Sequence, residues 1–112
     1  MLDWNAYRAE LMGRLGEIAK LSPDTVRGYQ TLAGAAAKNG RLEAKTVELI
    51  ALAVAVTTRC DGCITVHAEA AHKAGASREE IADALAVAVA LNAGAALVYS
   101  ARVLDAVVAT EN

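Results

Sequence analysis

Apolar side chains recur at helical spacing along most of the chain. In the first twenty residues they stand three or four positions apart, which predicts one helix that ends near Leu21. The Ser-Pro pair at 22–23 then opens a second helix, because serine caps a helix start and proline fits the first helical position. This second helix is expected to run to Lys38, with the Asn-Gly pair at 39–40 as its stop.

The middle of the chain predicts two further helices. The third starts at Leu42 or Glu43 and carries the apolar run VELIALAVAVT. The fourth begins between Cys60 and Gly62 and stops at Gly75, where glycine suits a helix end.

The last third of the chain predicts a fifth and a sixth helix. Ser77 and Glu80 form a capping box that opens the fifth, and the sixth runs from about Ala93 to Ala109 after a break at 92–94. No stretch alternates with period two, so no strand is expected. The pattern therefore predicts a single all-α domain over residues 1–112, with about six helices.

Two of the predicted helices, LIALAVAV and ALAVAVAL, are apolar around their whole circumference. Such helices must be covered on all sides, which is difficult in one small bundle. We therefore expect an obligate oligomer that buries one or both of them between subunits.

The composition agrees with thin, closely packed helices. Alanine makes up about a quarter of the chain, aromatic residues only 4%, and there is no phenylalanine. Alanine is the strongest helix former, and its short side chain lets helices approach closely. Trp4, Tyr7 and Tyr99 are expected to be packing residues.

The charge of the chain gives no reason to expect nucleic acid or a membrane as a partner. The formal net charge is -2, and no basic stripe stands out. In the longest apolar segment, residues 82–100, Asp83 and Asn92 leave unbroken runs only half of the ~20 residues that a membrane span needs. No signal peptide is visible, so we expect a cytoplasmic protein. There, a close cysteine pair is more often catalytic or metal-binding than a structural disulfide.

Both cysteines and both histidines lie in CDGCITVHAEAAH, residues 60–72. A zinc site would need all four to converge. If the chain is helical from Cys63 onward, His67 lies one turn on, whereas His72 is about half a revolution away. No metal and no cofactor is therefore expected, and His72 is expected at the surface near Glu69.

A redox dithiol fits the spacing better. Cys60 and Cys63 stand three residues apart in the first turn of a helix, so their Cα atoms are expected ~5–6 Å apart, within disulfide range. The unpaired N–H groups and the dipole of the helix start stabilise a thiolate there. The side chain of His67 tilts back toward the Cys63 sulfur. Asp61 disfavours a thiolate but suits a helix start, and the sequence does not decide which effect is larger.

Residues 48–94 strongly resemble the AhpD-like alkylhydroperoxidase core of the carboxymuconolactone decarboxylase superfamily. The redox motif of that family is a glutamate, eleven intervening residues, and then Cys-x-x-Cys-x-x-x-His. Here Glu48 is followed by eleven residues, then Cys60, Cys63 and His67. This four-point match is far more specific than Cys-x-x-Cys alone.

The resemblance draws attention to Glu48. If the chain turns near residues 57–60, the two flanking helices run antiparallel, and Glu48 can face the level of His67 and Cys63. A carboxylate in an apolar helix is costly unless it is paired. We therefore expect a relay from Glu48 to the thiols through His67 or a water, with an ordinary solvated acid as the alternative.

The resemblance also implies an activity. Cys60, Cys63, His67 and Glu48 would be the catalytic residues of a thiol peroxidase, assembled as a trimer, hexamer or related form. A hydroperoxide would be reduced to its alcohol, and the disulfide re-reduced by a dithiol such as a lipoyl-bearing protein. Full-length peroxidase members are longer than this chain, and the decarboxylase branch does not depend on the cysteine pair.

Three functions therefore compete. The first is a dithiol peroxidase or disulfide oxidoreductase, which the presence of the pair favours. The second is a lactone decarboxylase-like enzyme, in which a base-lined apolar pocket matters and the thiols are incidental. The third is a non-enzymatic oligomeric redox sensor. Which sulfur attacks first is open, since Cys60 is nearer the helix start and Cys63 nearer His67.

Overall fold

The chain folds into α-helices joined by short connections. The structure is a computed structural model, and it describes residues 1–111. The helices are α1 (Trp4–Leu21), α2 (Pro23–Ala33), α3 (Ala35–Asn39), α4 (Ala44–Thr58), α5 (Asp61–Lys73) and α6 (Arg78–Thr110). Within the described residues there is no strand, so the all-α prediction is confirmed.

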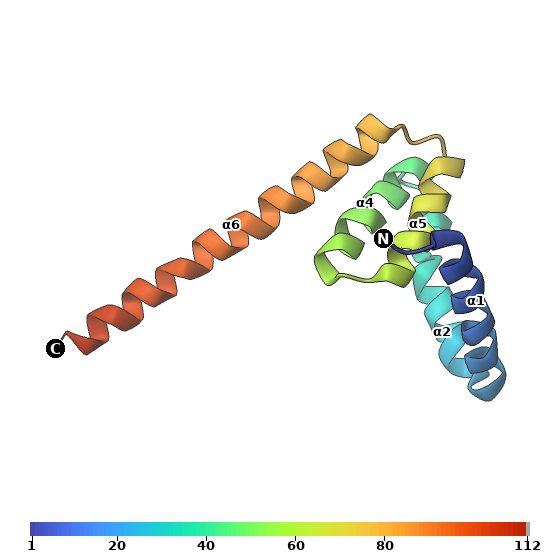
Figure 1. Cartoon of the computed structure of the whole chain (residues 1–112), viewed down its shortest axis with the longest axis horizontal. Coiled ribbons are helices and arrows are strands. Elements are labelled where there is room, and N and C mark those ends of the chain that lie inside the picture. The colour runs from blue at the N-terminus through green and yellow to red at the C-terminus, as the bar shows by residue number, and fades with distance from the viewer. Residues whose placement is uncertain (112) are drawn as a thin grey trace.

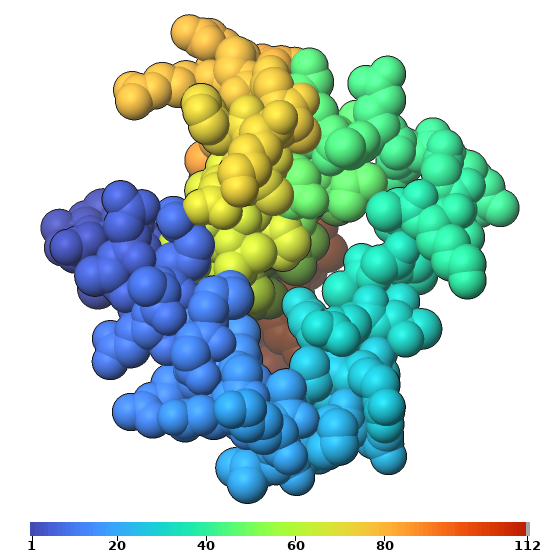
Figure 2. All heavy atoms as spheres, turned by 90° about the vertical axis from the view of Figure 1, so that its right-hand side faces the viewer, coloured from blue at the N-terminus to red at the C-terminus, as the bar shows by residue number. Residues whose placement is uncertain are grey.

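A hairpin of α4 and α5 forms the centre of the molecule. α1 packs on α5, α6 packs on α4, and α2 folds back along α1 (Figure 1). Figure 1 also shows α6 as a long straight helix whose second half extends beyond all the other helices. In Figure 2 the α1–α2 hairpin forms a lobe beside α5. The molecule is therefore elongated, with extents of 60, 37 and 35 Å.

Several helix ends lie where local sequence signals predicted them. Pro23 occupies the first turn of α2, and Gly40 follows α3 with a φ of 71° in the left-handed region. Ser77 and Glu80 form the predicted capping box at the start of α6, each side chain accepting the other's backbone N–H. Gly75, with a φ of 88°, lies in the turn after α5.

The second predicted helix is divided in two. The sequence predicted one helix from Pro23 to Lys38, but α2 ends at Ala33 and α3 begins at Ala35. Gly34 lies between them, and its N–H donates to the carbonyl of Gln30 at 3.0 Å. Glycine has more backbone freedom than any other residue, and it weakens a helix interior, so the break falls there.

The fifth and sixth predicted helices are in fact one helix. Asn92 and Gly94, expected to separate them, lie inside α6. The Asn92 side-chain N–H donates to the Ala88 carbonyl at 2.7 Å and to the Thr57 hydroxyl of α4 at 3.0 Å. Because this side chain bridges two helices, it does not end the one that carries it. The described chain still has six helices, divided differently from the prediction.

The buried core is small and rich in alanine. Leu52 of α4, Ala71 of α5 and Ala76 of the α5–α6 turn form it, with Leu49 and Ile81 packed against it. Short side chains let these elements approach closely, as the composition predicted.

Polar contacts fasten α1 to α5. Thr65 is only 2% exposed. Its hydroxyl accepts from Arg8 Nε at 3.2 Å and donates to the Trp4 carbonyl at 3.5 Å. Arg8 also pairs with Glu69 at 2.7 Å. Two long-range hydrogen bonds and an ion pair therefore fix the first turns of α1 against α5.

The aromatic residues differ in their surroundings. Trp4 and Tyr7 are half-buried and meet edge to face, with ring centroids 6.2 Å apart. Tyr99 is 68% exposed and lies under the Arg102 guanidinium, 5.1 Å from its ring centroid. The prediction that Tyr99 packs inside the fold is therefore wrong for the single chain, because this part of α6 extends beyond the other helices.

Candidate active site

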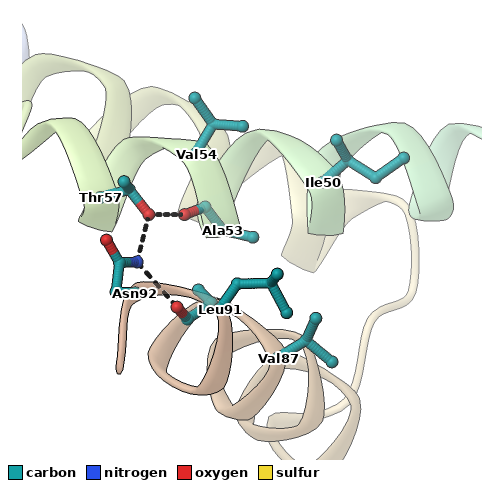
Figure 3. A pocket seen from close by; sticks show the side chains of 8 residues that line it. Ile50, Ala53, Val54, Thr57, Val87, Leu91 and Asn92 are labelled. Carbon is teal, nitrogen blue, oxygen red and sulfur yellow. Dashed lines mark hydrogen bonds between the residues drawn. The ribbon is translucent and has the colours of Figure 1, made fainter. Parts of the chain in front are cut away.

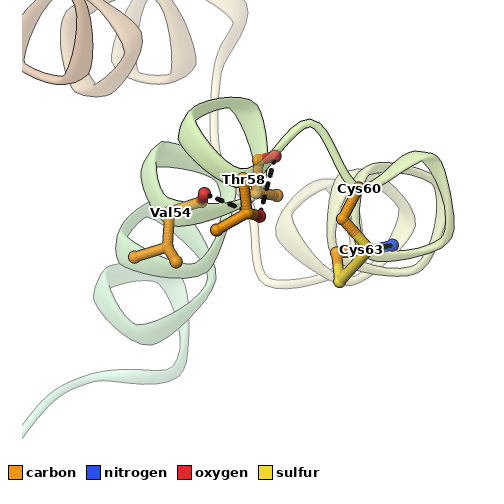
Figure 4. Close-up of a disulfide and its surroundings, with 5 residues drawn as sticks. Val54, Thr58, Cys60 and Cys63 are labelled. Atoms are coloured by element: carbon orange, nitrogen blue, oxygen red, sulfur yellow. Dashed lines mark hydrogen bonds between the residues drawn. A yellow bond between two sulfur atoms is a disulfide. The ribbon is translucent and has the colours of Figure 1, made fainter. Parts of the chain in front are cut away.

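A tight corner between α4 and α5 places the two cysteines (Figure 4). Arg59 adopts a left-handed φ of 55°, which only a few per cent of non-glycine residues do. The N–H of Cys60 donates back to the Ala55 carbonyl at 3.1 Å. α5 begins at the next residue, so the corner sets Cys60 directly before the helix and Cys63 in its first turn.

Cys60 and Cys63 form a disulfide, with their Cα atoms 5.2 Å apart. This separation confirms the range that the helical spacing predicted. The N–H of Cys63 also donates to the Cys60 sulfur at 3.1 Å, so Cys60 is the N-cap of α5. No sequence pattern predicted this second role, because serine, threonine, aspartate and asparagine are the usual N-cap residues.

Glu48 and His67 meet across the α4–α5 hairpin. Glu48 Oε2 lies 2.6 Å from His67 Nδ1, and the two side chains are 20% and 31% exposed. The expectation that Glu48 faces His67 is confirmed, and the alternative of a solvated acid is wrong. An ionised Glu48 accepts from Nδ1–H, which fixes the ring and leaves Nε2 as the nitrogen that can exchange a proton elsewhere.

The remaining polar residues of the motif lie at the surface. Asp61 is the first residue of α5 and is exposed, in the position where an acidic side chain suits the helix dipole. His72 is also exposed, as expected, but Glu69 pairs with Arg8 and Lys73. Among residues 1–111, no three histidine, cysteine or acidic side chains gather where they could hold a metal ion.

α1 covers the first turn of α5, a relationship that the sequence did not signal. A Cβ atom added to Gly62 would lie 3.0 Å from Leu11 Cδ2 and 4.0 Å from the Tyr7 hydroxyl oxygen. Glycine between the cysteines therefore lets α1 approach the backbone of the redox turn. A larger residue at position 62 would force Leu11 aside.

An apolar groove lies between α4 and α6 (Figure 3). It has a volume of about 360 Å³ and neither cysteine lines it. The lining residues are Ile50, Ala53, Val54, Thr57, Val87, Ala88, Leu91 and Asn92. The groove is thus separate from the sulfurs, although one of its walls is the helix that carries Glu48.

The geometry and the sequence together define the family. The carboxymuconolactone decarboxylase family matches residues 23–106, which include all four motif residues. The chain therefore belongs to the carboxymuconolactone decarboxylase family, and its centre is consistent with the AhpD-like core of that superfamily.

Individual relatives agree with this assignment. A protein of Haemophilus influenzae described as uncharacterized is 56% identical over 104 residues, covering 93% of this chain and 92% of its own length. An uncharacterized protein of Cupriavidus necator is 32% identical and covers 91% and 90%. A crystal structure of a carboxymuconolactone decarboxylase family protein from Legionella pneumophila is 37% identical, with a TM-score of 0.75 and 91% coverage of both chains.

Proposed function

We propose that this protein is a thiol-dependent peroxidase of the peroxiredoxin-like alkylhydroperoxidase type, or a closely related disulfide oxidoreductase. The observation that carries the proposal is the Cys60–Cys63 disulfide at a helix start, with His67 one turn further along α5 and bonded to Glu48. Each of these residues has a use in one reaction, and the same site needs no metal or organic cofactor.

The reaction balances with the chain's own groups. In the dithiol form, one thiolate attacks a peroxide oxygen; the O–O bond breaks, and the alkoxide takes a proton to leave as the alcohol. The attacking sulfur becomes a sulfenic acid. The second thiol then attacks it, the S–O bond breaks, and water leaves as the Cys60–Cys63 disulfide forms. An external dithiol, such as a lipoyl-bearing protein, takes up the disulfide's oxidising equivalents by thiol–disulfide exchange.

His67 and Glu48 supply proton transfer in this scheme. Glu48 orients the ring through Nδ1, so Nε2 takes a thiol proton and later delivers a proton to the leaving oxygen. The helix start stabilises the thiolate, and the N–H of Cys63 is already directed at the Cys60 sulfur. Glu48 acts through His67 and is therefore a positioning residue and relay.

The test is a thiol count and a turnover assay on the purified protein. Free thiols are counted by gel shift before and after one equivalent of hydrogen peroxide or an organic hydroperoxide. Consumption of the peroxide is then followed with dihydrolipoamide as reductant. Wild type, Cys60→Ser, Cys63→Ser and His67→Ala are compared, with His72→Ala as the matched control for removing an exposed histidine.

In the wild type, peroxide should remove both free thiols, and both serine variants should lose turnover. The serine variant that still forms a sulfenic acid, detected with dimedone, retains the attacking sulfur. If both serine variants consume peroxide as fast as the parent, the peroxidase proposal is wrong and lactone decarboxylase-like chemistry, with incidental thiols, is favoured. Reversible oxidation without turnover would instead identify a redox sensor.

A further inference from the structure

Arg59 lies in a backbone conformation that favours glycine. It directly follows the last residue of α4, and its φ of 55° and ψ of 48° are in the left-handed region. Helices commonly end with glycine in this conformation, because a Cβ atom there crowds the following carbonyl oxygen. Arginine is therefore less stable than glycine at this position. Residues held in such conformations cluster at functional sites, so the guanidinium is a candidate for a function.

The helix end itself does not need the Arg59 side chain. The N–H groups of Arg59 and Cys60 both donate to the Ala55 carbonyl, so main-chain hydrogen bonds close the end of α4. A cation also suits the negative end of a helix, but any position in the last turn would provide that effect without the left-handed backbone. The last turn of α4 has no basic residue. What arginine adds at this corner is therefore a guanidinium next to Cys60.

The guanidinium of Arg59 is not used within the described chain. The residue is exposed, and its side chain has no hydrogen bond, ion pair or ring contact with any other of residues 1–111. The hydroxyls of Thr57 and Thr58, by contrast, donate to backbone carbonyls of the preceding turn of α4. Of the polar side chains at this corner, Arg59 is thus the one whose donors are all available to a bound molecule.

Arg59 also places a positive charge beside the disulfide. It directly precedes Cys60, whose sulfur is bonded to that of Cys63. Asp61, on the other side of Cys60, is the first residue of α5, where the positive end of the helix dipole offsets its charge. A full positive charge and unused hydrogen-bond donors therefore lie next to the disulfide, and both attract an anion.

We propose that Arg59 is a specificity-determining residue that selects a dithiol reductant with a carboxylate near its thiols. The guanidinium presents its N–H groups in a planar fork, which binds a carboxylate through two parallel hydrogen bonds. The bound molecule is the reductant, because the reductant reacts with the disulfide, whereas a peroxide reacts with the dithiol form. This role of Arg59 rests on the proposed function, which supplies the exchange reaction.

The exchange itself also gains from the positive charge. A thiolate of the reductant attacks one sulfur of the disulfide, the Cys60–Cys63 bond breaks, and a mixed disulfide and a cysteine thiolate form. The second thiolate of the reductant then attacks the mixed disulfide and releases the other cysteine. Two electrons pass to the cysteine pair, and the two protons of the reductant thiols end on the cysteines. Each attacking group is an anion, so a neighbouring cation favours its approach.

The carboxylate can belong to either of two molecules. A free dithiol acid carries its own carboxylate, and a lipoyl-bearing protein presents acidic side chains beside the lipoyl-lysine. Both sources offer the same group to Arg59. The experiment therefore includes one pair of reductants for each source.

The first pair is dihydrolipoate and dihydrolipoamide, which share one dithiol and differ only in a carboxylate or a neutral amide. The second pair is a short peptide with dihydrolipoyl-lysine between two glutamates, and the same peptide with two glutamines. The second-order rate constant for reducing the oxidised protein is measured without peroxide, by gel shift of its thiols after acid quenching. The ratio within a pair is then compared between wild type and Arg59→Gln, which cancels intrinsic differences between the reductants.

Three further variants complete the set. Arg59→Lys keeps the charge but not the planar fork. Arg59→Gly removes the side chain at a position that suits glycine, so it keeps the corner folded. Arg41→Gln is the matched control: it removes another exposed arginine without an ion pair in the described chain, and Arg41 precedes α4, at the opposite end of that helix from Cys60.

The anionic reductant of a pair should reduce wild type about fivefold faster than the neutral one, as for a favourable exposed ion pair. High salt should diminish this preference. Arg59→Gln and Arg59→Gly should lose it, Arg59→Lys should keep part of it, and Arg41→Gln should keep all of it. A preference in the first pair identifies the carboxylate of the dithiol itself, and one confined to the peptides identifies carboxylates of a protein reductant.

Equal rates within both pairs would overturn the proposal, as would a preference that Arg59→Gln retains. Peroxide consumption is measured separately on the same samples. If the protein consumes no peroxide, the proposed function fails, but the rates of disulfide reduction still decide the role of Arg59.

Discussion

Glu48 Oε2 lies 2.6 Å from His67 Nδ1, although the two residues are nineteen positions apart in the sequence. The pair connects the two helices that meet at the cysteine corner, and it places a carboxylate behind the imidazole that follows Cys63 by one turn. A histidine held in this way has a fixed ring and one nitrogen available for proton transfer.

Replacing Glu48 by Gln should slow peroxide consumption while leaving the fold intact. The amide oxygen can still accept from His67 Nδ1–H, but the negative charge that supports a protonated ring is lost. We expect a fall of about 10²-fold in turnover and a change in the pH–rate profile. Glu43→Gln, which removes an exposed acid at the start of the same helix, should change neither. An unchanged profile in Glu48→Gln would remove Glu48 from the relay.

Replacing Gly62 by alanine should affect the free energy of unfolding differently from replacing Gly13 by alanine. Ala is the better helix former by about 1 kcal/mol, and a Cβ on Gly13 meets nothing within 4 Å, so Gly13→Ala should raise the free energy of unfolding by up to that amount. A Cβ on Gly62 meets Leu11 at 3.0 Å. Gly62→Ala should therefore raise the free energy of unfolding by less than Gly13→Ala does, or lower it. Urea denaturation measures both.

The same comparison in a Leu11→Ala background tests the cause. With the leucine truncated, Gly62→Ala should recover the gain that Leu11 prevents, giving a coupling between the two positions. Equal stabilisation by Gly62→Ala and Gly13→Ala in the presence of Leu11 would show that α1 does not press on the redox turn.

The Lys45–Glu80 ion pair should make stability depend on pH in acid. Lys45 Nζ lies 2.8 Å from Glu80 Oε2, joining the starts of α4 and α6. The hydrogen bond from Lys45, followed by that from the Ser77 backbone, lowers the pKa of Glu80 from 4.5 to about 2. The folded state therefore binds fewer protons than the unfolded state. The stabilisation is complete above pH 4.5 and is lost as the pH falls toward about 2.

Thermal unfolding between pH 2 and 6 checks this prediction. Glu80→Gln should lower the melting temperature near neutral pH and flatten its acid dependence, because the amide keeps the capping geometry but not the charge. The matched control is Glu79→Gln, which removes the neighbouring acid in the same turn of α6. A melting profile for Glu80→Gln that is parallel to wild type would contradict the assignment.

Replacing Thr65 by Val should destabilise the attachment of α1. The substitution keeps the shape but removes the buried hydroxyl that accepts from Arg8 and donates to the Trp4 carbonyl. We expect a loss of about 1 kcal/mol in the free energy of unfolding. Thr31→Val removes an exposed hydroxyl that bonds within its own helix, so it should stay within about 0.5 kcal/mol of wild type.

Local signals predicted most helix ends, and long-range contacts account for the errors. Pro23, Gly40 and the Ser77 capping box act within one turn, so the sequence alone located them. Asn92 is a helix breaker only if its side chain competes with its own backbone. Here it bonds Thr57 on another helix, a contact that no local pattern contains.

The residues of the candidate site also differ in whether a local pattern or a long-range contact places them. The pairing of Cys60 with Cys63 follows from the geometry of a single helix, and the structure places their Cα atoms in the predicted range. The same helix carries His67 one turn after Cys63. Glu48 stands on a different helix, and only the resemblance to a known family drew attention to it. Leu11, which presses on Gly62, comes from a third helix and escaped both arguments.

The sulfur of Cys60 caps α5 by accepting the N–H of Cys63. The amide proton of Cys63 therefore senses whatever is bonded to that sulfur, because a change in the acceptor changes the strength of its hydrogen bond. In an amide NMR spectrum this one proton reports the chemical state of the cysteine pair, without an added label and within the intact protein.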